Sequence, residues 1–317
     1  MFTHLHPWSI LLALLTLTCA LAAEDKKDAA DELTFRNTVS EVRVTFFATD
    51  EKNRPPGTVT KSDFVVVDGE RVVRSFRSFT HADETSLELV ALVDVSGSVA
   101  PRFRTAMSDV VQLITREQSI PSDNISVVSF GGMGPVILCA SSCRASDSLA
   151  KLQAVKSDGL TPLFDALMFA ADFVSQHRRD GVRPVLVLFS DGDDTISLHT
   201  PLEALEAVQA AGAAIYAVDL GTSDNRSSNQ SRGSVFLRHI SEATGGRYFT
   251  STPRVSHVDD VAAVVNAVLE DLQASYVVTY ELPSHQPGFH SLRLLPTHNL
   301  NLTFHSRNGY NYEPNVH

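Results

Sequence analysis

The chain has 317 residues, 43% of them hydrophobic and 20% charged, which is the balance of an ordinary globular protein. This length suffices for one large domain and one small domain. The formal net charge of −11 at pH 7 argues against nucleic acid or an anionic membrane as the partner.

The N-terminus has the pattern of an export signal. Residues 9–23 are apolar and uncharged, and Ala20-Leu21-Ala22 fits the small-x-small cleavage rule. We predict a signal peptide over residues 1–22 and a charged, flexible leader over residues 23–34. The apolar run is short for a membrane span, and lipidation at Cys19 stays open as an alternative. The mature chain is expected to be secreted, periplasmic or in the cell envelope, with no membrane span.

Residues 35–82 predict a small N-terminal β module. The apolar residues between Val39 and Ala48 have the spacing of a strand, and Asn53-Arg54-Pro55-Pro56-Gly57 is typical of a turn. Two apolar runs on either side of Asp68-Gly69 predict a hairpin.

Residues 83–274 alternate between strand and helix patterns, which indicates an α/β domain with a parallel sheet. Strands are expected at 87–93, 125–130, 136–138, 185–189, 213–218 and 247–249, and helices at 101–117, 145–155, 162–177, 200–211, 235–244 and 258–272. The run at 136–138 follows a glycine-rich turn, so it predicts an antiparallel edge strand beside 125–130.

Residues 275–317 return to a β pattern, with short strands expected at 276–280, 291–295 and 300–304. Three strands at either end of the chain are too few to bury a face alone. We therefore expect these strands to pack with residues 35–82, so that the α/β domain is inserted into one β module.

Two cysteines remain once Cys19 is removed with the signal peptide. Cys139 and Cys143 are four residues apart at the end of the expected edge strand. A disulfide between them suits an oxidising compartment, and two free thiols are the alternative. A zinc site lacks support because no second cysteine pair or neighbouring histidine completes it.

The strand at 87–93 leads directly into Asp94-Val95-Ser96-Gly97-Ser98, whose oxygens at alternate positions can face one point. Thr161 and Asp191 also follow turns or strands that end at this edge of a parallel sheet. Such a set of hydroxyls and carboxylates suits one hard cation, Mg²⁺ or Mn²⁺. The expected direct ligands are Ser96, Ser98 and Thr161, while Asp94 and Asp191 hold the cation through water.

Each of these pieces also has a purely structural interpretation. Asp and Ser after a strand are common turn residues, and Asp191-Gly192 is a turn signal by itself. Thr161 before Pro162 has the pattern of a helix N-cap followed by proline at the first helical position. The occurrence of all three pieces in order favours the metal site.

Several segments together are similar to one known family. They are Leu92-Val93-Asp94-Val95-Ser96-Gly97-Ser98, Gly159-Leu160-Thr161-Pro162-Leu163-Phe164-Asp165-Ala166-Leu167, Val185-Leu186-Val187-Leu188-Phe189-Ser190-Asp191-Gly192-Asp193-Asp194, Ile215-Tyr216-Ala217-Val218-Asp219-Leu220-Gly221 and Ala243-Thr244-Gly245-Gly246-Arg247-Tyr248-Phe249. Over about residues 35–312 the chain resembles a von Willebrand factor type A domain, and more closely the VWFA-related domain family described from acidobacteria. Val99 departs from that family, which often has Met at this position.

The resemblance implies a doubly wound α/β fold, with a mostly parallel six-stranded sheet covered by helices on both faces and a small β module at its ends. It also implies a metal-ion-dependent adhesion site (MIDAS) that binds proteins. The expected function is an exported adhesion or scaffold module whose Mg²⁺ accepts an Asp or Glu carboxylate from a protein partner. Partner binding would shift the helix at 258–272 between two packings.

Two alternatives stay open. One is a structural envelope domain with a stabilising or vestigial metal site. The other is a metal-dependent hydrolase that uses Asp193 or Asp194 as a base, although no histidine lies in a catalytic or metal cluster and neither glycine-rich run is a phosphate loop.

Overall fold

The computed structural model describes residues 41–52, 54–82, 86–116, 120–179, 181–221, 232–250, 266 and 268–313. The predicted signal peptide at 1–22, the leader at 23–34 and Cys19 lie outside these ranges. Most of the helix predicted at 258–272 does so too, although residues 268–273 are helical. Among the described helices, none is both long and apolar enough to cross a bilayer.

The central element is a six-stranded sheet with the order β10-β9-β8-β5-β6-β7. Its strands are β5 (Ser86–Asp94), β6 (Ile125–Gly131), β7 (Gly134–Ala140), β8 (Val182–Ser190), β9 (Ala214–Asp219) and β10 (Tyr248–Thr250). All neighbouring pairs are parallel except β6 with β7, which form the expected antiparallel hairpin at one edge. The chain moves from β5 to β6 on one side and later to β8 on the other, so the strand order reverses beside β5.

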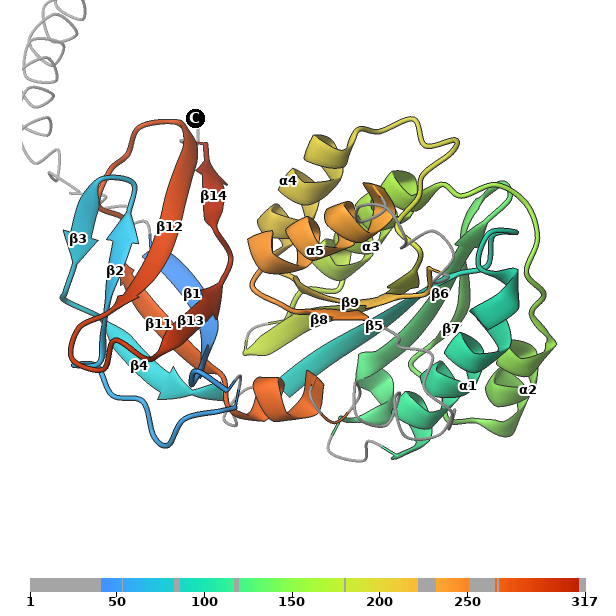
Figure 1. The fold of residues 1–317 in the computed structure, drawn as a ribbon, viewed down its shortest axis with the longest axis horizontal. Helices are drawn as coiled ribbons and strands as arrows, with labels where there is room; N and C mark the ends of the chain where they lie inside the picture. The colour runs from blue at the N-terminus through green and yellow to red at the C-terminus, as the bar shows by residue number, and fades with distance from the viewer. Residues whose placement is uncertain are drawn as a thin grey trace, which may run out of the picture. The chain divides into compact units, whose positions relative to one another are not determined.

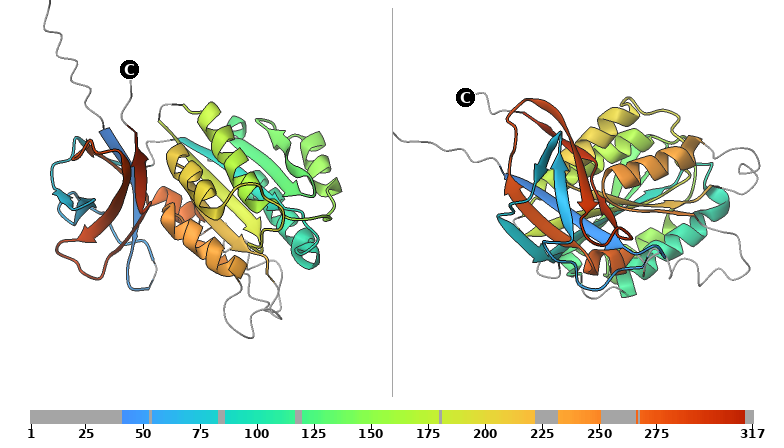
Figure 2. Two further views of the ribbon diagram at one scale, coloured as in Figure 1. Left: turned by 90° about the horizontal axis from the view of Figure 1, so that it is seen from above. Right: turned by 60° about the vertical axis from the view of Figure 1, so that its left-hand side comes forward.

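Helices cover both faces of this sheet (Figures 1 and 2). One face packs against α1 (Ala100–Arg116), α2 (Ser146–Ala154) and the helical residues 268–272. The other packs against α3 (Leu163–Gln176), α4 (Pro201–Ala211) and α5 (Arg232–Ala243). Alternate residues of β5 supply the two cores, Leu89, Ala91 and Val93 to the first and Val90 and Leu92 to the second. The predicted doubly wound α/β fold is therefore confirmed.

The strands at the two ends of the chain form two further four-stranded sheets, β13-β1-β11-β4 and β14-β12-β2-β3. The strands are β1 (Glu41–Thr49), β2 (Phe64–Asp68), β3 (Arg71–Val73), β4 (Ser78–His81), β11 (Tyr276–Glu281), β12 (Gly288–Pro296), β13 (Thr303–Ser306) and β14 (Gly309–Tyr312). Each sheet thus mixes strands that precede and follow the central domain. The domain boundaries at 35–82, 83–274 and 275–317 stay predictions.

Two of these strands were not predicted from the sequence, and a third was predicted at the wrong residues. β4 and β14 are only four residues long, too short for an alternating pattern to stand out. The strand predicted at 300–304 is instead β13, because Leu302 donates to the Asn299 carbonyl in a turn and Leu300 is exposed.

A buried carboxylate ties the two sheets of the β module together. Asp68 at the end of β2 accepts hydrogen bonds from the hydroxyls of Tyr280 on β11 and Tyr310 on β14, each at 2.7 Å. These three side chains are all buried, so the bonds satisfy polar groups that would otherwise be costly.

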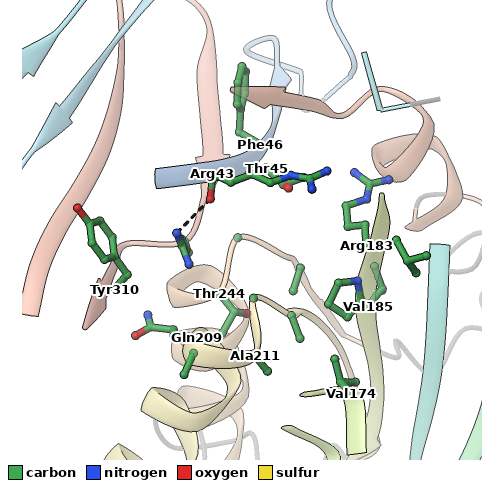
Figure 3. Close-up of a pocket in the computed structure, with 18 of the residues that line it drawn as sticks. Arg43, Thr45, Phe46, Val174, Arg183, Val185, Gln209, Ala211, Thr244 and Tyr310 are labelled. Atoms are coloured by element: carbon green, nitrogen blue, oxygen red, sulfur yellow. Dashed lines mark hydrogen bonds between the residues drawn. The ribbon is translucent and has the colours of Figure 1, made fainter. Parts of the chain in front are cut away.

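The β module also contacts the central domain through backbone and side-chain hydrogen bonds. Asn308, just before β14, donates its backbone N–H to Ala243 and accepts from the Gln209 amide at 2.8 Å. Within the β module, the Arg307 side chain donates to the Arg43 carbonyl on β1 at 3.1 Å. A pocket lies between β1, β8 and the end of α4 (Figure 3).

Cys139, near the end of β7, forms a disulfide with Cys143. Both residues are buried beside the core that α1 and α2 cover. The two cysteines are therefore disulfide-bonded in the structure. That they are also oxidised in an exported protein stays a prediction.

Asp109 on α1 gives a testable dependence of stability on pH. Its side chain is 4% exposed, and burial raises its pKa from 3.8 to about 7. The folded state therefore keeps a proton up to about pH 7, whereas the unfolded state loses it near pH 4. Within this window the free energy of unfolding falls as the pH rises, and it levels off above the window.

We expect Asp109→Asn to remove this part of the pH dependence. At pH 8 the variant gains about 1–4 kcal/mol over wild type, and below pH 4 the two converge. Urea denaturation from pH 4 to 8 measures the difference, with Asp123→Asn at an exposed position as control. A constant gap between Asp109→Asn and wild type across this range would contradict the assignment.

Candidate metal site

Asp94 is the last residue of β5 and has no exposed surface. Its Oδ1 accepts a hydrogen bond from the Ser96 backbone N–H at 2.9 Å, and its Oδ2 accepts one from the Ser190 hydroxyl at 2.7 Å. Burial raises the pKa of Asp94 to about 6, and the nearby charge of Asp191 adds to this rise. The carboxylate is thus held in one orientation at the carboxyl edge of the sheet.

Ser96 and Ser98 lie on the turn that follows. Their Oγ atoms are 3.0 Å apart, with Ser96 buried and Ser98 exposed. Adjacent ligands around an octahedral Mg²⁺ with bonds of 2.0–2.1 Å are about 2.9 Å apart, so this spacing fits two neighbouring positions. The Gly97 N–H donates to the Gly159 carbonyl at 2.9 Å, which joins this turn to the loop that carries Thr161.

Thr161 is buried and lies between two loops. Its backbone N–H donates to the Thr195 hydroxyl at 2.7 Å, and its carbonyl accepts from the Thr195 N–H at 2.9 Å. Upstream, Asp158 N–H donates to the Val95 carbonyl at 2.7 Å. Backbone bonds therefore hold the Thr161 loop against both the Ser96–Ser98 turn and the loop after β8.

The interpretation of Thr161 as a helix N-cap is wrong. Helix α3 begins at Leu163, and its N-cap residue is Pro162, which has no side-chain hydrogen bond. The amides of its first turn are instead satisfied by the following loop. Phe164 N–H donates to Asp194 at 3.2 Å, and Asp165 N–H donates to the Ser197 hydroxyl at 3.1 Å. The Thr161 side chain does not serve as the cap of this helix.

Asp191 follows β8 and accepts a hydrogen bond from the Asp193 N–H at 3.2 Å. Its charge contributes to the raised pKa of both Asp94 and Asp193, so its carboxylate lies within electrostatic reach of both groups. The neighbouring Ser190 hydroxyl also accepts from the Gly192 N–H at 3.0 Å, and so links the Asp94 carboxylate to the Asp191 loop.

The five predicted residues thus lie on three loops that hydrogen bonds hold together at the carboxyl edge of the sheet. The Ser96 and Ser98 hydroxyls contact each other directly, and Thr161 is joined to the Thr195 loop through its backbone. No group of three or more His, Cys, Asp or Glu side chains suited to a metal occurs among the described residues.

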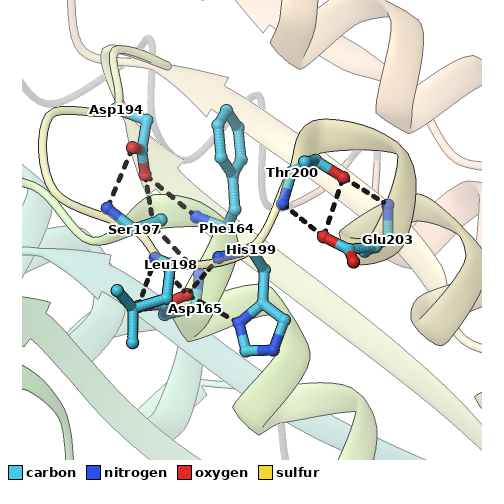
Figure 4. Close-up of polar contacts among 8 residues, drawn as sticks. All are labelled: Phe164, Asp165, Asp194, Ser197, Leu198, His199, Thr200 and Glu203. Atoms are coloured by element: carbon cyan, nitrogen blue, oxygen red, sulfur yellow. Dashed lines mark hydrogen bonds and ion pairs between the residues drawn. The ribbon is translucent and has the colours of Figure 1, made fainter.

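The loop after Asp191 is fixed to α3 by a polar network (Figure 4). Asp194 accepts bonds from Ser197 and from the Phe164 N–H. Asp165 accepts from the Leu198 and His199 N–H groups and from His199 Nδ1 at 2.7 Å. The Asp194 carboxylate therefore holds this loop against α3. This role argues against Asp194 as the catalytic base of a hydrolase, which was one of two candidates.

Gly192 and Gly233 form a close backbone contact that the sequence analysis did not identify. A Cβ added at Gly233 would lie 2.2 Å from the Asp191 carbonyl oxygen, and one at Gly192 would lie 2.3 Å from the Gly233 oxygen. The start of α5 thus packs against the Asp191 loop with no room for a side chain. The only sequence signal was the glycine after Asp191, because its contact is 41 residues away along the chain.

Ser190 and Asp219 were also missed. Asp219 ends β9, is fully buried and accepts hydrogen bonds from the Ser234 hydroxyl at 2.7 Å and the Tyr248 hydroxyl at 2.6 Å. It contributes to the raised pKa of Asp193. The sequence did contain a signal for Asp219, because it directly follows the strand predicted at 213–218 and lies in one of the segments that resemble the family.

The fold and this site define an α/β domain with a candidate cation site at the carboxyl edge of its sheet. The sequence profile described as von Willebrand factor type A domain matches residues 89–193, which include all five predicted ligands. The chain therefore contains, over residues 89–193, a region of the von Willebrand factor type A domain family.

Among curated proteins, the chain is similar to two kinds of magnesium-chelatase subunit. It is 28% identical to the 60 kDa subunit of Rhodobacter capsulatus over 110 residues, which is 35% of this chain and 20% of that protein. It is 28% identical to the 67 kDa subunit of Chlorobaculum parvum over 186 residues, 53% of this chain and 29% of that protein. The match thus spans less than a third of either relative.

Among solved structures, manganese-loaded TRAP protein of Plasmodium vivax matches with a TM-score of 0.43 and 16% identity. The match covers 80% of this chain and 100% of that one.

The contact between Gly233 and the Asp191 loop yields a prediction. Gly233→Ala forces the two backbones apart, so we expect a loss of about 1–3 kcal/mol in the free energy of unfolding. Because the same contact positions Asp191, divalent-cation affinity should fall about tenfold or more. The matched control is Gly57→Ala, where an added Cβ meets nothing within 4 Å.

Denaturation and calorimetry with Mg²⁺ measure the two effects. A Gly233→Ala protein as stable as Gly57→Ala would show that the contact is not formed in solution.

Proposed function

We propose that this domain is a metal-dependent protein-binding module. Ser96, Ser98 and Thr161 would bind one Mg²⁺ or Mn²⁺ directly, and Asp94 and Asp191 would hold it through water. The observation that carries the proposal is the 3.0 Å spacing of the Ser96 and Ser98 oxygens beside a buried, oriented Asp94. Neutral hydroxyls with carboxylates behind them are donors that hard cations accept.

The chain's own residues explain why such a site would bind a partner. Asp94 uses one oxygen for the Ser96 N–H and the other for Ser190, which supports an indirect role in metal binding. A cation bound mainly by hydroxyls keeps most of its charge and attracts an outside carboxylate. Ser98 is exposed, so an Asp or Glu of a protein partner can approach the site from solvent.

Two alternatives to a protein-binding module are a metal-dependent hydrolase and a structural domain. A metal-dependent hydrolase needs a base, and Asp194 is already bonded to Ser197 and α3, which leaves Asp193. Similarity to magnesium-chelatase subunits covers only part of those proteins, and we propose that this chain contributes binding without catalysis. A structural domain with a vestigial site would keep its stability when the metal is removed.

We further propose that the protein is exported. The N-terminal sequence has a signal-peptide pattern, and a disulfide joins Cys139 and Cys143, which suits an oxidising compartment. Mass spectrometry of the native protein would then find a start near Ala23 and no alkylatable thiol.

Metal binding is tested by calorimetry with Mg²⁺ and Mn²⁺. We expect saturable 1:1 binding, a higher melting temperature with metal, and at least a tenfold loss of affinity in Asp94→Ala and Asp191→Ala. Thr161→Ala should show a similar loss, whereas Thr58→Ala, at an exposed position on the β module, should bind as wild type. Unchanged affinity in both aspartate variants would refute the ligand assignment.

Partner binding is tested by capture from envelope extract, with Mg²⁺ or with chelator. Capture should require both the metal and Thr161, and should be lost in Thr161→Ala but not in Thr58→Ala. Excess acetate should compete, since it offers the same carboxylate. If capture survives both the chelator and the Thr161 change, the contact surface lies elsewhere.

A further inference from the structure

A second polar site lies at the opposite edge of the central sheet. Arg183 is at the beginning of β8, whereas Asp191 follows its end, roughly 26 Å away at about 3.3 Å per residue. A pocket of about 380 Å³ opens beside Arg183, between β1, β8, the turn after α4 and β14 (Figure 3). This pocket is therefore separate from the metal site.

The pocket is strongly basic although the protein is acidic overall. It is lined by five arginines and two glutamates: Arg43, Arg178, Arg179, Arg183, Arg307, Glu41 and Glu88. Glu41 already forms an ion pair with Arg77 at 2.6 Å, and Arg77 does not line the pocket. Burial raises the pKa of Glu88, and the nearby charge of Arg179 opposes this rise. Among the described residues, no carboxylate forms an ion pair with Arg43, Arg178, Arg183 or Arg307.

Arg183 is the most unusual of these groups. It is only 6% exposed, and its Nη2 donates to the Leu272 carbonyl at 2.9 Å. Its Nε and Nη1 are buried and have no hydrogen-bond partner among the described residues. Burial and the charge of Arg43 lower the pKa of Arg183 to about 10, which still leaves it charged at neutral pH. A buried, charged guanidinium with two unused donors is costly unless a ligand completes it.

Arg307 and Arg43 extend this arrangement along one side of the pocket. Arg307 donates through Nη2 to the Arg43 carbonyl, and its own buried Nε has no hydrogen-bond partner in the described part of the chain. The side chain of Arg43 is exposed and faces the charge of Arg183. Figure 3 shows Arg43 and Arg183 on one side of the pocket, with Tyr310 and Gln209 across from them.

We propose that this pocket binds a small oxyanion ligand, a carboxylate or a phosphate, through Arg183, Arg307 and Arg43. Guanidinium groups recognise both chemistries through paired N–H donors. Arg183 keeps donors at Nε and at Nη1, on two sides of the guanidinium, that have no partner among the described residues. The volume suits a small molecule. Because the pocket joins β1 and β14 to β8, bound anion would also stabilise the contact between the β module and the central sheet.

The test is calorimetry and thermal melting of the full chain with inorganic phosphate and, separately, with citrate. The protein is first depleted of metal and dialysed free of chelator, because both probes bind divalent cations and a chelator is itself an anion. Sodium chloride at equal ionic strength controls for screening. We expect saturable binding of at least one probe, and the preferred probe indicates whether a phosphate or a carboxylate is the natural ligand.

Three variants decide whether the pocket is responsible. Arg183→Met and Arg43→Gln should each weaken the affinity tenfold or more. Arg293→Gln, which removes an exposed arginine of β12 outside the pocket, should leave it unchanged. Without added anion, Arg183→Met should melt at or above the wild-type temperature, because it removes a buried unpaired charge.

Two results would overturn the proposal. One is the absence of saturable binding by either probe, and the other is binding that Arg43→Gln leaves intact. Since Arg43 is exposed, its replacement decides the matter even if Arg183→Met fails to fold. Metal binding at Ser96 and Ser98 is measured in the same variants and should not change, so the failure of one site is distinguishable from the failure of the other.

Discussion

A buried carboxylate is costly unless both of its oxygens accept hydrogen bonds. Asp94 has no exposed surface and lies at the point where the strand order reverses, and both of its oxygens accept hydrogen bonds. One oxygen accepts a hydrogen bond from the Ser96 N–H and thereby shapes the turn that carries Ser96 and Ser98. The other accepts one from the Ser190 hydroxyl, which itself accepts a bond from the Gly192 N–H and so fixes the start of the Asp191 loop. The rest of the edge is assembled around this single group, because both neighbouring loops depend on it.

The loops around Asp94 have little freedom. The Thr161 loop is bonded to the Gly97 turn on one side and to Thr195 on the other, and Asp194 and Ser197 occupy the first amides of α3. Gly233 contacts the Asp191 backbone where a side chain would not fit. Such a preorganised edge loses little entropy when a ligand binds, which is the property that a binding module requires.

The central sheet separates charge along its strands. Its carboxyl edge gathers Asp94, Asp191, Asp193 and Asp219, while its amino edge holds Arg183 beside the arginines of the β module. A cation suits the first edge and an anion the second. Strands from both ends of the chain build the β module, and Asp68 joins its sheets through two tyrosine hydroxyls. The basic pocket therefore exists only when the ends of the chain have come together.

Much of this protein follows from local sequence. The alternation of apolar runs and helical patterns predicted the central sheet and its described helices to within a few residues. The reason is that β5, β6, β8 and β9 are largely buried and their sequences are mainly apolar. Asp94, Ser96, Ser98, Thr161 and Asp191 were predicted as one site because strand ends and the loop before a helix place polar residues at the same edge of a parallel sheet. Their role as metal ligands stays a prediction. β4 and β14 were not predicted, because a strand of four residues is too short to show a clear alternation of apolar and polar residues.

Tertiary structure alone decided which of these groups meet. Thr161 has the local pattern of an N-cap, yet α3 takes its caps from Asp194 and Ser197, more than thirty residues later. The contact between Gly192 and Gly233 and the gathering of Arg43, Arg183 and Arg307 join residues far apart in the chain. Local sequence carries propensity and periodicity, but a buried charge or a close backbone approach depends on which distant segment packs against it, and packing is decided only when the whole chain has folded.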